Sequence, residues 1–260
     1  MGHVRLGNLP RTKKWQQVVD LVAEGGDLGQ VAAASAEAVE SGLRSASLDP
    51  TLVHAFWLLT QLPLAARKGD FAAELRALGF DVKSNPTLLA LAGAFTRAVD
   101  GQIERSGGRT DLGEIAQLSA AETLTSLVGR DLPGLFGPTP DDVQNVVAKL
   151  ASSERFSVLA RDFFSRLTHR YLAYYLSREL SNHVGPGRRF RAIADHSEFN
   201  AALDLHCREA SRIIKEFSGG WYGKTLFQKG EISPDDAGRF AHVAFKKLRR
   251  ELRARRGLNE

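Results

Sequence analysis

One stretch decides the fold class: ERFSVLARDFFSRLTHRYLAYYLSRELSN, residues 154–182. Its apolar residues recur every three or four positions, which places them on one side of an α-helix. They are Phe156, Ala160, Phe163, Leu167, Tyr171 and Tyr174. Gly185-Pro186-Gly187 follows closely and is a strong stop signal. The sequence therefore predicts one long helix from Glu154 to about Asn182.

The same spacing extends over almost the whole chain, and no alternation of period two is sustained. Helix starts are expected near Trp15, at Asp27, Asp49-Pro50, Asp70, Asn85-Pro86, Thr110, Thr139-Pro140 and Ser233-Pro234, with one further helix across Phe199–Phe217. The stretch SGGWYGKTLFQKG, residues 218–230, is expected to be a loop because it holds four glycines. The pattern predicts an all-α globular protein of about nine to ten helices.

Composition removes several classes of protein. An apolar fraction of 43% is too high for a disordered chain. A single cysteine, Cys207, excludes an intramolecular disulfide and a multi-cysteine metal site. No apolar run reaches the roughly 18 residues of a membrane span, and the start MGHVRLGNLPRTKKW has no apolar signal region. We expect a soluble protein in a reducing compartment, the cytoplasm, with no metal and no cofactor.

The charge is unevenly distributed between two halves. Residues 1–140 carry 13 Lys and Arg against 15 Asp and Glu, whereas residues 141–260 carry 22 against 15. The change coincides with GRDLPGLFGPTP, residues 129–140, which holds three prolines and three glycines. We therefore expect two packed helical lobes, a near-neutral one over 1–137 and a basic, aromatic-rich one over 138–260. Arginine exceeds lysine by 25 to 10, which with many Ala and Gly is typical of a GC-rich bacterial genome.

The most basic segment is RFAHVAFKKLRRELRARR, residues 239–256, with eight Lys and Arg and one Glu. Its apolar positions Ala241, Phe245, Leu248 and Leu252 share one helical face, which is expected to dock on the lobe. Cations one turn apart on the other face match the spacing of a phosphate backbone. The candidate nucleic-acid contacts are Lys246, Lys247, Arg249, Arg250, Arg253 and Arg256, together with Arg188, Arg189 and Arg191 on a turn. Phe190, Trp221 and Tyr222 lie near basic residues, so a single strand or RNA is one possible ligand.

These observations favour a non-enzymatic helical adaptor of a bacterial multi-protein assembly, binding nucleic acid with little sequence specificity. Two other interpretations of the basic helix stay open: it docks on an acidic partner protein, or it is simply solvated. A third alternative is an exposed apolar groove of the first lobe that binds another chain.

A competing hypothesis is a hydrolase or nuclease in the second lobe. It requires a histidine to meet a carboxylate within hydrogen-bond reach in a pocket. The candidates are His169, His196 and His206, with Asp195, Glu198 and Asp204. No pair among them has both metal-ligand spacing and a third ligand nearby in sequence.

Three segments resemble one of two known motifs, a phosphate-binding loop or a helix-turn-helix unit, but do not match it. Residues 219–225, GGWYGKT, end like a phosphate-binding loop, but the first required glycine is replaced by Ser218. Residues 31–43 and 115–127 resemble helix-turn-helix units but lack the turn glycine. Acidic residues also stand where such a unit contacts phosphate, so both segments are better explained as plain amphipathic helices.

Overall fold

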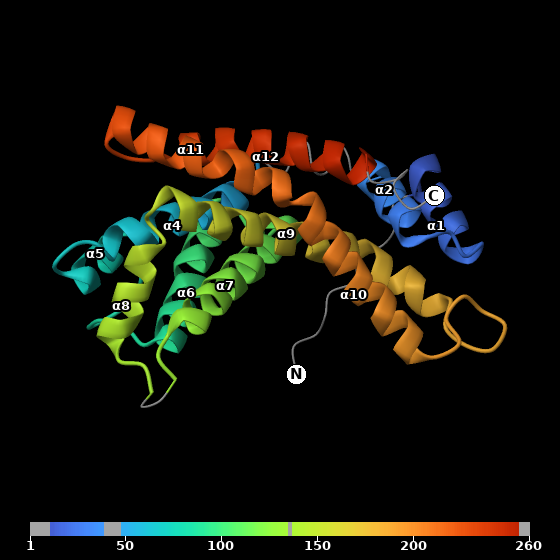
Figure 1. The fold of residues 1–260 in the computed structure, drawn as a ribbon, viewed down its shortest axis with the longest axis horizontal. Helices are drawn as coiled ribbons and strands as arrows, with labels where there is room; N and C mark the ends of the chain where they lie inside the picture. Colours follow the sequence, from blue (N-terminus) through green and yellow to red (C-terminus); the bar gives the residue numbers. More distant parts are fainter. Residues whose placement is uncertain (1–10, 39–47, 135–136, 255–260) are drawn as a thin grey trace.

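The computed structural model describes residues 11–38, 48–134 and 137–254. Within these ranges the chain forms eleven α-helices and no strand, which confirms the all-α prediction (Figure 1). They are α1 (Lys13–Ala23), α2 (Leu28–Ala38), α4 (Pro50–Ala65), α5 (Phe71–Ala77), α6 (Leu88–Arg105), α7 (Asp111–Asp131), α8 (Pro140–Lys149), α9 (Ser153–Asn182), α10 (Ile193–Ala210), α11 (Arg212–Lys229) and α12 (Pro234–Ala254). None of these helices is long and apolar enough to cross a bilayer.

Most helix starts agree with the capping signals in the sequence, but the start expected at Asn85-Pro86 lies at Leu88, with Thr87 as the cap. The carboxylate of Asp49 accepts hydrogen bonds from the backbone N–H groups of Thr51 and Leu52 at the start of α4. At the start of α8, Thr139 and Asp142 accept from each other's backbone N–H groups. Such caps satisfy N–H groups that a helix leaves unpaired at its first turn. Short polar residues followed by Pro therefore predicted these starts correctly.

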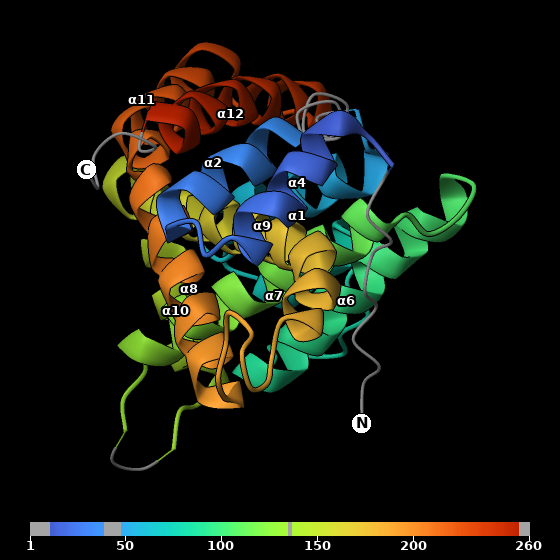
Figure 2. The ribbon, with the colours of Figure 1, turned by 90° about the vertical axis from the view of Figure 1, so that its right-hand side faces the viewer.

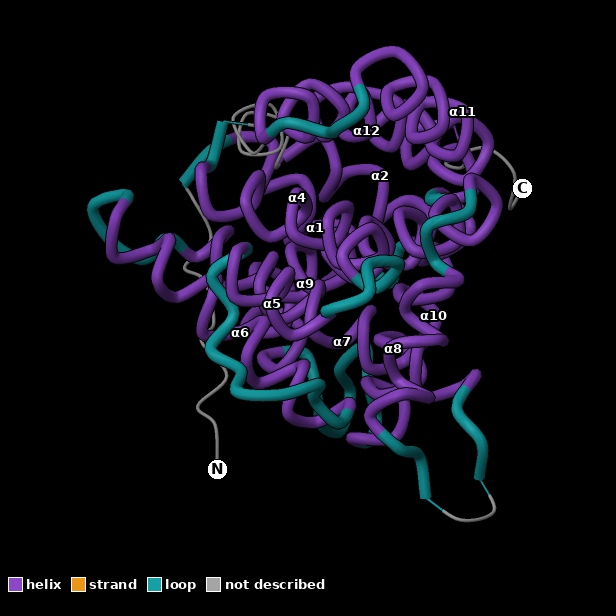
Figure 3. Tube along the Cα trace, turned by 90° about the vertical axis from the view of Figure 1, so that its left-hand side faces the viewer, coloured by secondary structure: helices purple, strands orange, loops and turns teal. Residues whose placement is uncertain are grey.

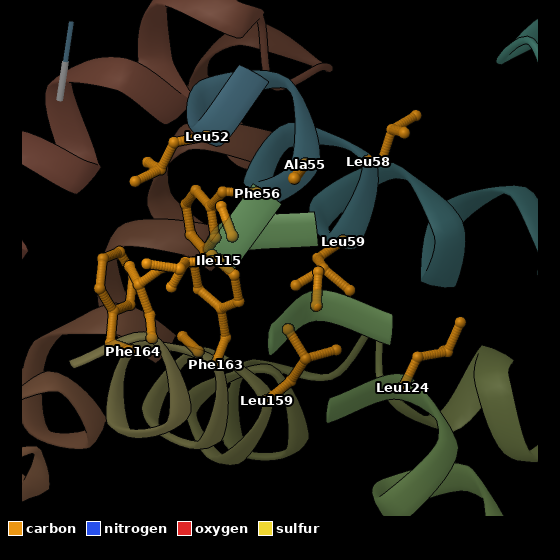
Figure 4. Packing of buried hydrophobic residues seen from close by; sticks show 14 of the residues in the cluster. Leu52, Ala55, Phe56, Leu58, Leu59, Ile115, Leu124, Leu159, Phe163 and Phe164 are labelled. Atoms are coloured by element: carbon orange, nitrogen blue, oxygen red, sulfur yellow. The ribbon is translucent and has the colours of Figure 1, made fainter. Parts of the chain in front are cut away.

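The core is built where α4, α9 and α12 meet. The ring of Phe56 in α4 lies 5.3 Å from that of Phe164 in α9 and 5.2 Å from that of Phe240 in α12, centroid to centroid. Figure 4 shows Phe56 pointing from α4 toward Phe163 and Phe164. One cluster of buried hydrophobic side chains extends from Trp15 to Phe245 and so includes both sides of residue 137. The division into two lobes at that residue stays a prediction.

The loop predicted over residues 218–230 is wrong, because residues up to Lys229 belong to the continuous helix α11. Gly219 and Gly223 share a side of α11 that lies against Ser153, the first residue of α9. A Cβ atom at position 219 would come within 2.5 Å of the carbonyl oxygen of Ser153, and one at 223 within 2.7 Å of its hydroxyl. The glycines thus allow a close contact between helices, which offsets the helix penalty of about 1 kcal/mol for each glycine.

The single helix predicted across Phe199–Phe217 is also wrong. The helical chain is interrupted at Ser211, which separates α10 from α11. Ser211 is buried and its hydroxyl donates to the carbonyl oxygen of Cys207, so the bend is closed by a local hydrogen bond. Both α10 and α11 pack against α9, and α11 leads the chain into α12.

Candidate nucleic-acid interface

Helix α12 is divided into a buried face and a solvent face. Ala241, Phe245, Leu248 and Leu252 are all buried, at 2% exposure or less, as the spacing predicted. Neighbouring elements α2, α4, α10 and α11 cover this face. The apolar stripe therefore seats the helix and leaves its other side for solvent or a ligand.

The solvent face of α12 carries a row of basic side chains. Between positions 239 and 253 its exposed residues are Arg239, His242, Val243, Lys246, Arg250 and Arg253. At 3.6 residues per turn they fall within an arc of about 100°. Four of the six are Lys or Arg, so one narrow stripe concentrates positive charge along about four turns of helix.

The cations of the candidate set differ in how they are held. Neither Lys246 nor Arg250 forms an ion pair with a described residue. The ammonium of Lys247 lies 5.3 Å from the ring centroid of Phe217 in α11, and Arg249 is half-buried. Arg256 lies outside the described residues. The exposed charge of α12 is therefore centred on Lys246 and Arg250, and Arg253 extends the row as a further exposed cation.

The turn that leads into α12 is fixed to the body of the protein. Trp57 Nε1 and Gln61 Nε2, both on α4, donate to the carbonyl oxygen of Ile232 at 2.8 and 3.0 Å. The carboxylate of the buried Asp236 accepts from Lys229 at 2.6 Å. This hydrogen bond, helped by those from Arg239 and Ser233, holds the pKa of Asp236 well below its usual range. α12 is thus held rigidly at its start.

The two helices α11 and α12 lie side by side as the outermost layer, above α2 and α4 (Figures 2 and 3). Residues 212–254 carry ten Lys and Arg and five Asp and Glu. Their net charge of +5 equals that of the whole chain, so the other residues are balanced. The excess positive charge of the protein belongs to this hairpin.

The second predicted basic segment, Arg188–Arg191, is used differently. Arg189 is partly buried and donates to the carbonyl oxygens of Leu21, Val22 and Gly26 at 3.2, 3.2 and 2.6 Å. It therefore satisfies carbonyl groups at the C-terminal end of α1 and in the turn that follows, and it holds that end of the helix in place.

Arg188 donates to the carbonyl oxygen of Asn182, and Arg191 is exposed. Helices α1 and α2 lie between this turn and α12 (Figures 1 and 2). The two basic segments therefore do not adjoin, and α12 is the candidate interface by itself.

The aromatic residues named from the sequence do not line a surface. Phe190 and Tyr222 are buried, and Trp221 is half-buried with its ring 4.4 Å from that of Phe240. Their expected role beside a nucleic acid is wrong, because each fills the core. Phe227 on α11 was missed: it is 92% exposed. Its position inside an expected loop gave no signal of this.

Of the proposed histidine–carboxylate pairs, the structure brings one together. His169 Nδ1 on α9 lies 3.9 Å from Asp204 Oδ1 on α10, and Arg208 Nε donates to the same carboxylate at 2.8 Å. Burial lowers the pKa of His169, and the charge of Asp204 opposes that effect. The 3.9 Å separation is longer than a hydrogen bond, so Asp204 does not orient the His169 ring as the carboxylate of a catalytic pair does.

Two other groups of that hypothesis, Asp195 and His196, have structural roles. Asp195 accepts from the backbone N–H groups of Arg191 and Ala192 and caps α10. The ring of His196 packs edge-on against Phe190. Burial raises the pKa of the Cys207 thiol, which disfavours the thiolate. Among the described residues, no three His, Cys, Asp or Glu side chains are grouped so as to hold a metal.

Among the described residues of the first half, the large apolar side chains that are exposed are Leu48, Leu89 and Leu118. They come from three separate segments: Leu48 lies in the turn before α4, Leu89 lies in α6, and Leu118 lies in α7. An apolar groove in this half stays a prediction.

Comparisons with protein-family models, with curated proteins and with solved structures gave no match. The function must therefore be argued from the charge and geometry of the molecule.

Proposed function

We propose that this protein binds nucleic acid, without catalysis, on the solvent face of α12. The observation that carries the proposal is the row of Lys246, Arg250 and Arg253 on a helix whose opposite face is buried. A rise of about 1.5 Å per residue puts these three positions about 6 and 4.5 Å apart along the axis. Consecutive phosphates of a strand can therefore meet consecutive cations.

The expected affinity is electrostatic. Cations that neutralise phosphates release condensed counterions, so binding is strong at low salt and weakens steeply as salt is added. Contacts to phosphate position a ligand and carry little sequence information. The protein is therefore expected to bind many sequences with similar affinity.

The test is the affinity of a triple variant, Lys246→Ala, Arg250→Ala and Arg253→Ala, for a labelled oligonucleotide at low salt, followed by fluorescence anisotropy. A matched control is Arg67→Ala, Lys68→Ala and Lys83→Ala, which removes three exposed cations elsewhere. The α12 variant should bind about ten-fold more weakly or worse, and the control should bind nearly as the wild type does.

Unfolding in urea checks that both variants keep the stability of the wild type. An equal loss of affinity in both variants would mean that net charge alone matters and that α12 is not the site. A wild type that binds no oligonucleotide at low salt would overturn the proposal, and an acidic partner protein would then be the ligand to seek.

A further inference from the structure

We infer, resting on the proposed function, that α12 binds a single strand in preference to a duplex and that a base of this strand stacks on Phe227. Two independent observations carry the inference. One is how deeply α12 is seated among its neighbours, and the other is the exposure of Phe227.

Helix α12 is not free to enter a groove of DNA. Its exposed positions from 239 to 253 cover an arc of only about 100°, and α2, α4, α10 and α11 contact the rest. A helix is about 10–12 Å thick, and the major groove is about 12 Å wide and 8.5 Å deep. A reading helix must therefore stand clear of its neighbours on both sides.

On one side of α12 that space is filled by α11. The rings of Phe217 and Trp221 lie 5.2 and 4.4 Å from the ring of Phe240, so the two helices are in direct contact. The stem of Lys247 also bends over Phe217. The sugar-phosphate strands on either side of a major groove would collide with α11. A duplex could therefore contact α12 only through the phosphates of one strand.

A single strand is not limited in this way. The row runs about 21 Å from Arg239, which also donates to Asp236, to Arg253, and a flexible backbone can follow its exposed side chains. The phosphates of a duplex instead curve away from a straight row after a few contacts. The same cations therefore meet more phosphates on a single strand.

Phe227 lies in the last turn of α11, which is tied to the first turns of α12, where the row begins. It is two residues before Lys229, whose ammonium reaches Asp236 at 2.6 Å, and Asp236 in turn accepts from Arg239 at 2.9 Å. It is the one aromatic ring among the large exposed apolar side chains of the described residues. Aromatic rings beside a track of cations are the stacking platforms of proteins that bind single strands, since every base has a flat apolar face.

The experiment titrates the full-length protein into a labelled single strand of about 15 nucleotides and into the duplex of the same sequence. The wild type should bind the single strand about ten-fold more tightly. Phe227→Ala should weaken binding of the strand about five-fold or more and leave the duplex unchanged. Phe227→Trp keeps a stacking ring and should restore the affinity. Leu89→Ala removes another highly exposed apolar side chain, on α6. It should change neither the affinity for the single strand nor the affinity for the duplex.

An abasic strand, which has the sugar-phosphate backbone but no bases, separates base stacking from a general effect of surface hydrophobicity. The wild type and Phe227→Ala should bind this strand equally, because no base is present to stack. Equal affinity for strand and duplex, or no effect of Phe227→Ala on the normal strand, would overturn the inference. The triple α12 variant would still weaken binding in that case, so the proposed function would stand. If the wild type bound neither oligonucleotide, both the inference and the proposed function would be overturned.

Discussion

Helices α9 and α12 both carry basic residues at helical spacing, yet they use them in different ways. On α9, Arg166 and Arg170 each contact the carboxylate of Glu122 in α7 at 2.5 Å. Arg166 also donates to Asp162 at 2.6 Å. On α12, Lys246 and Arg250 have no acidic partner among the described residues. Spacing alone therefore does not distinguish a structural cation from a binding one, whereas the facing side chain does.

The position of each helix explains the difference. α9 lies against α2, α7, α10 and α11, so Arg166 and Arg170 are partly buried and need partners to offset their desolvation. Burial raises the pKa of Glu122, but the hydrogen bond from Arg170 and the charges of both arginines outweigh it and leave the pKa below its usual value. α12 lies at the edge of the molecule, where water solvates the exposed Lys246 and Arg250 at no such cost.

The largest effect on stability is expected where α11 meets α9, because this contact seats the hairpin that carries α12. Gly219→Ala places a methyl group against the backbone of Ser153, and we expect a loss of about 3 kcal/mol in the free energy of unfolding. Urea unfolding measures it.

Gly220→Ala is the matched control, since a Cβ atom at this exposed helical position meets nothing within 4 Å. It should stabilise the protein by up to about 1 kcal/mol. If both substitutions had the same effect, the close approach of α11 to α9 would not depend on glycine.

The next effect separates the two sets of cations directly. Glu122→Ala leaves Arg166 and Arg170 without their shared partner and should lower the free energy of unfolding by about 2 kcal/mol, because the site is partly exposed. Lys246→Ala and Arg250→Ala should each change it by less than about 0.5 kcal/mol. Comparable losses from all three substitutions would show that the α12 cations are also structural.

A smaller effect concerns His54 of α4, a half-buried titratable group whose Nε2 has no hydrogen-bond partner among the described residues. Burial, with the charge of Arg105, lowers its pKa to about 4. The unfolded chain, with a pKa of about 6.5, then binds more protons, so stability is complete above about pH 6.5 and falls as the pH drops toward 4. We expect a loss of about 1 kcal/mol between pH 7 and pH 5 after allowing for partial exposure.

His54→Gln carries no titrating ring and should reduce that loss. Urea unfolding of both proteins at pH 7 and pH 5 measures the difference. The same pH dependence in the variant would assign the effect to another group.

Local signals predicted much of this fold, and contacts between distant segments explain what they missed. Thr139-Pro140 and Ser233-Pro234 announce helix starts because capping involves neighbours in sequence. The buried stripe of α12 followed from periodicity alone. Gly219 indicated a loop, since only its contact with Ser153 shows why a glycine belongs in that helix.

The candidate site was predictable only in part, for the same reason. The cations of α12 were identified because an amphipathic helix shows its outer face in its sequence. Arg189 looked equivalent to them, yet its guanidinium binds carbonyl oxygens more than 160 residues away in the chain. Phe227 was overlooked because exposure of a single ring is a property of the packed helices.

The most direct test of the α12 interface is the salt dependence of binding. The affinities of the wild type and of the Lys246, Arg250 and Arg253 triple variant for one single strand would be measured between about 50 and 200 mM salt. Three lost phosphate contacts should make the slope of log K against log salt shallower by about 2 in the variant. An unchanged slope would contradict the account, because it would mean that these cations meet no phosphate.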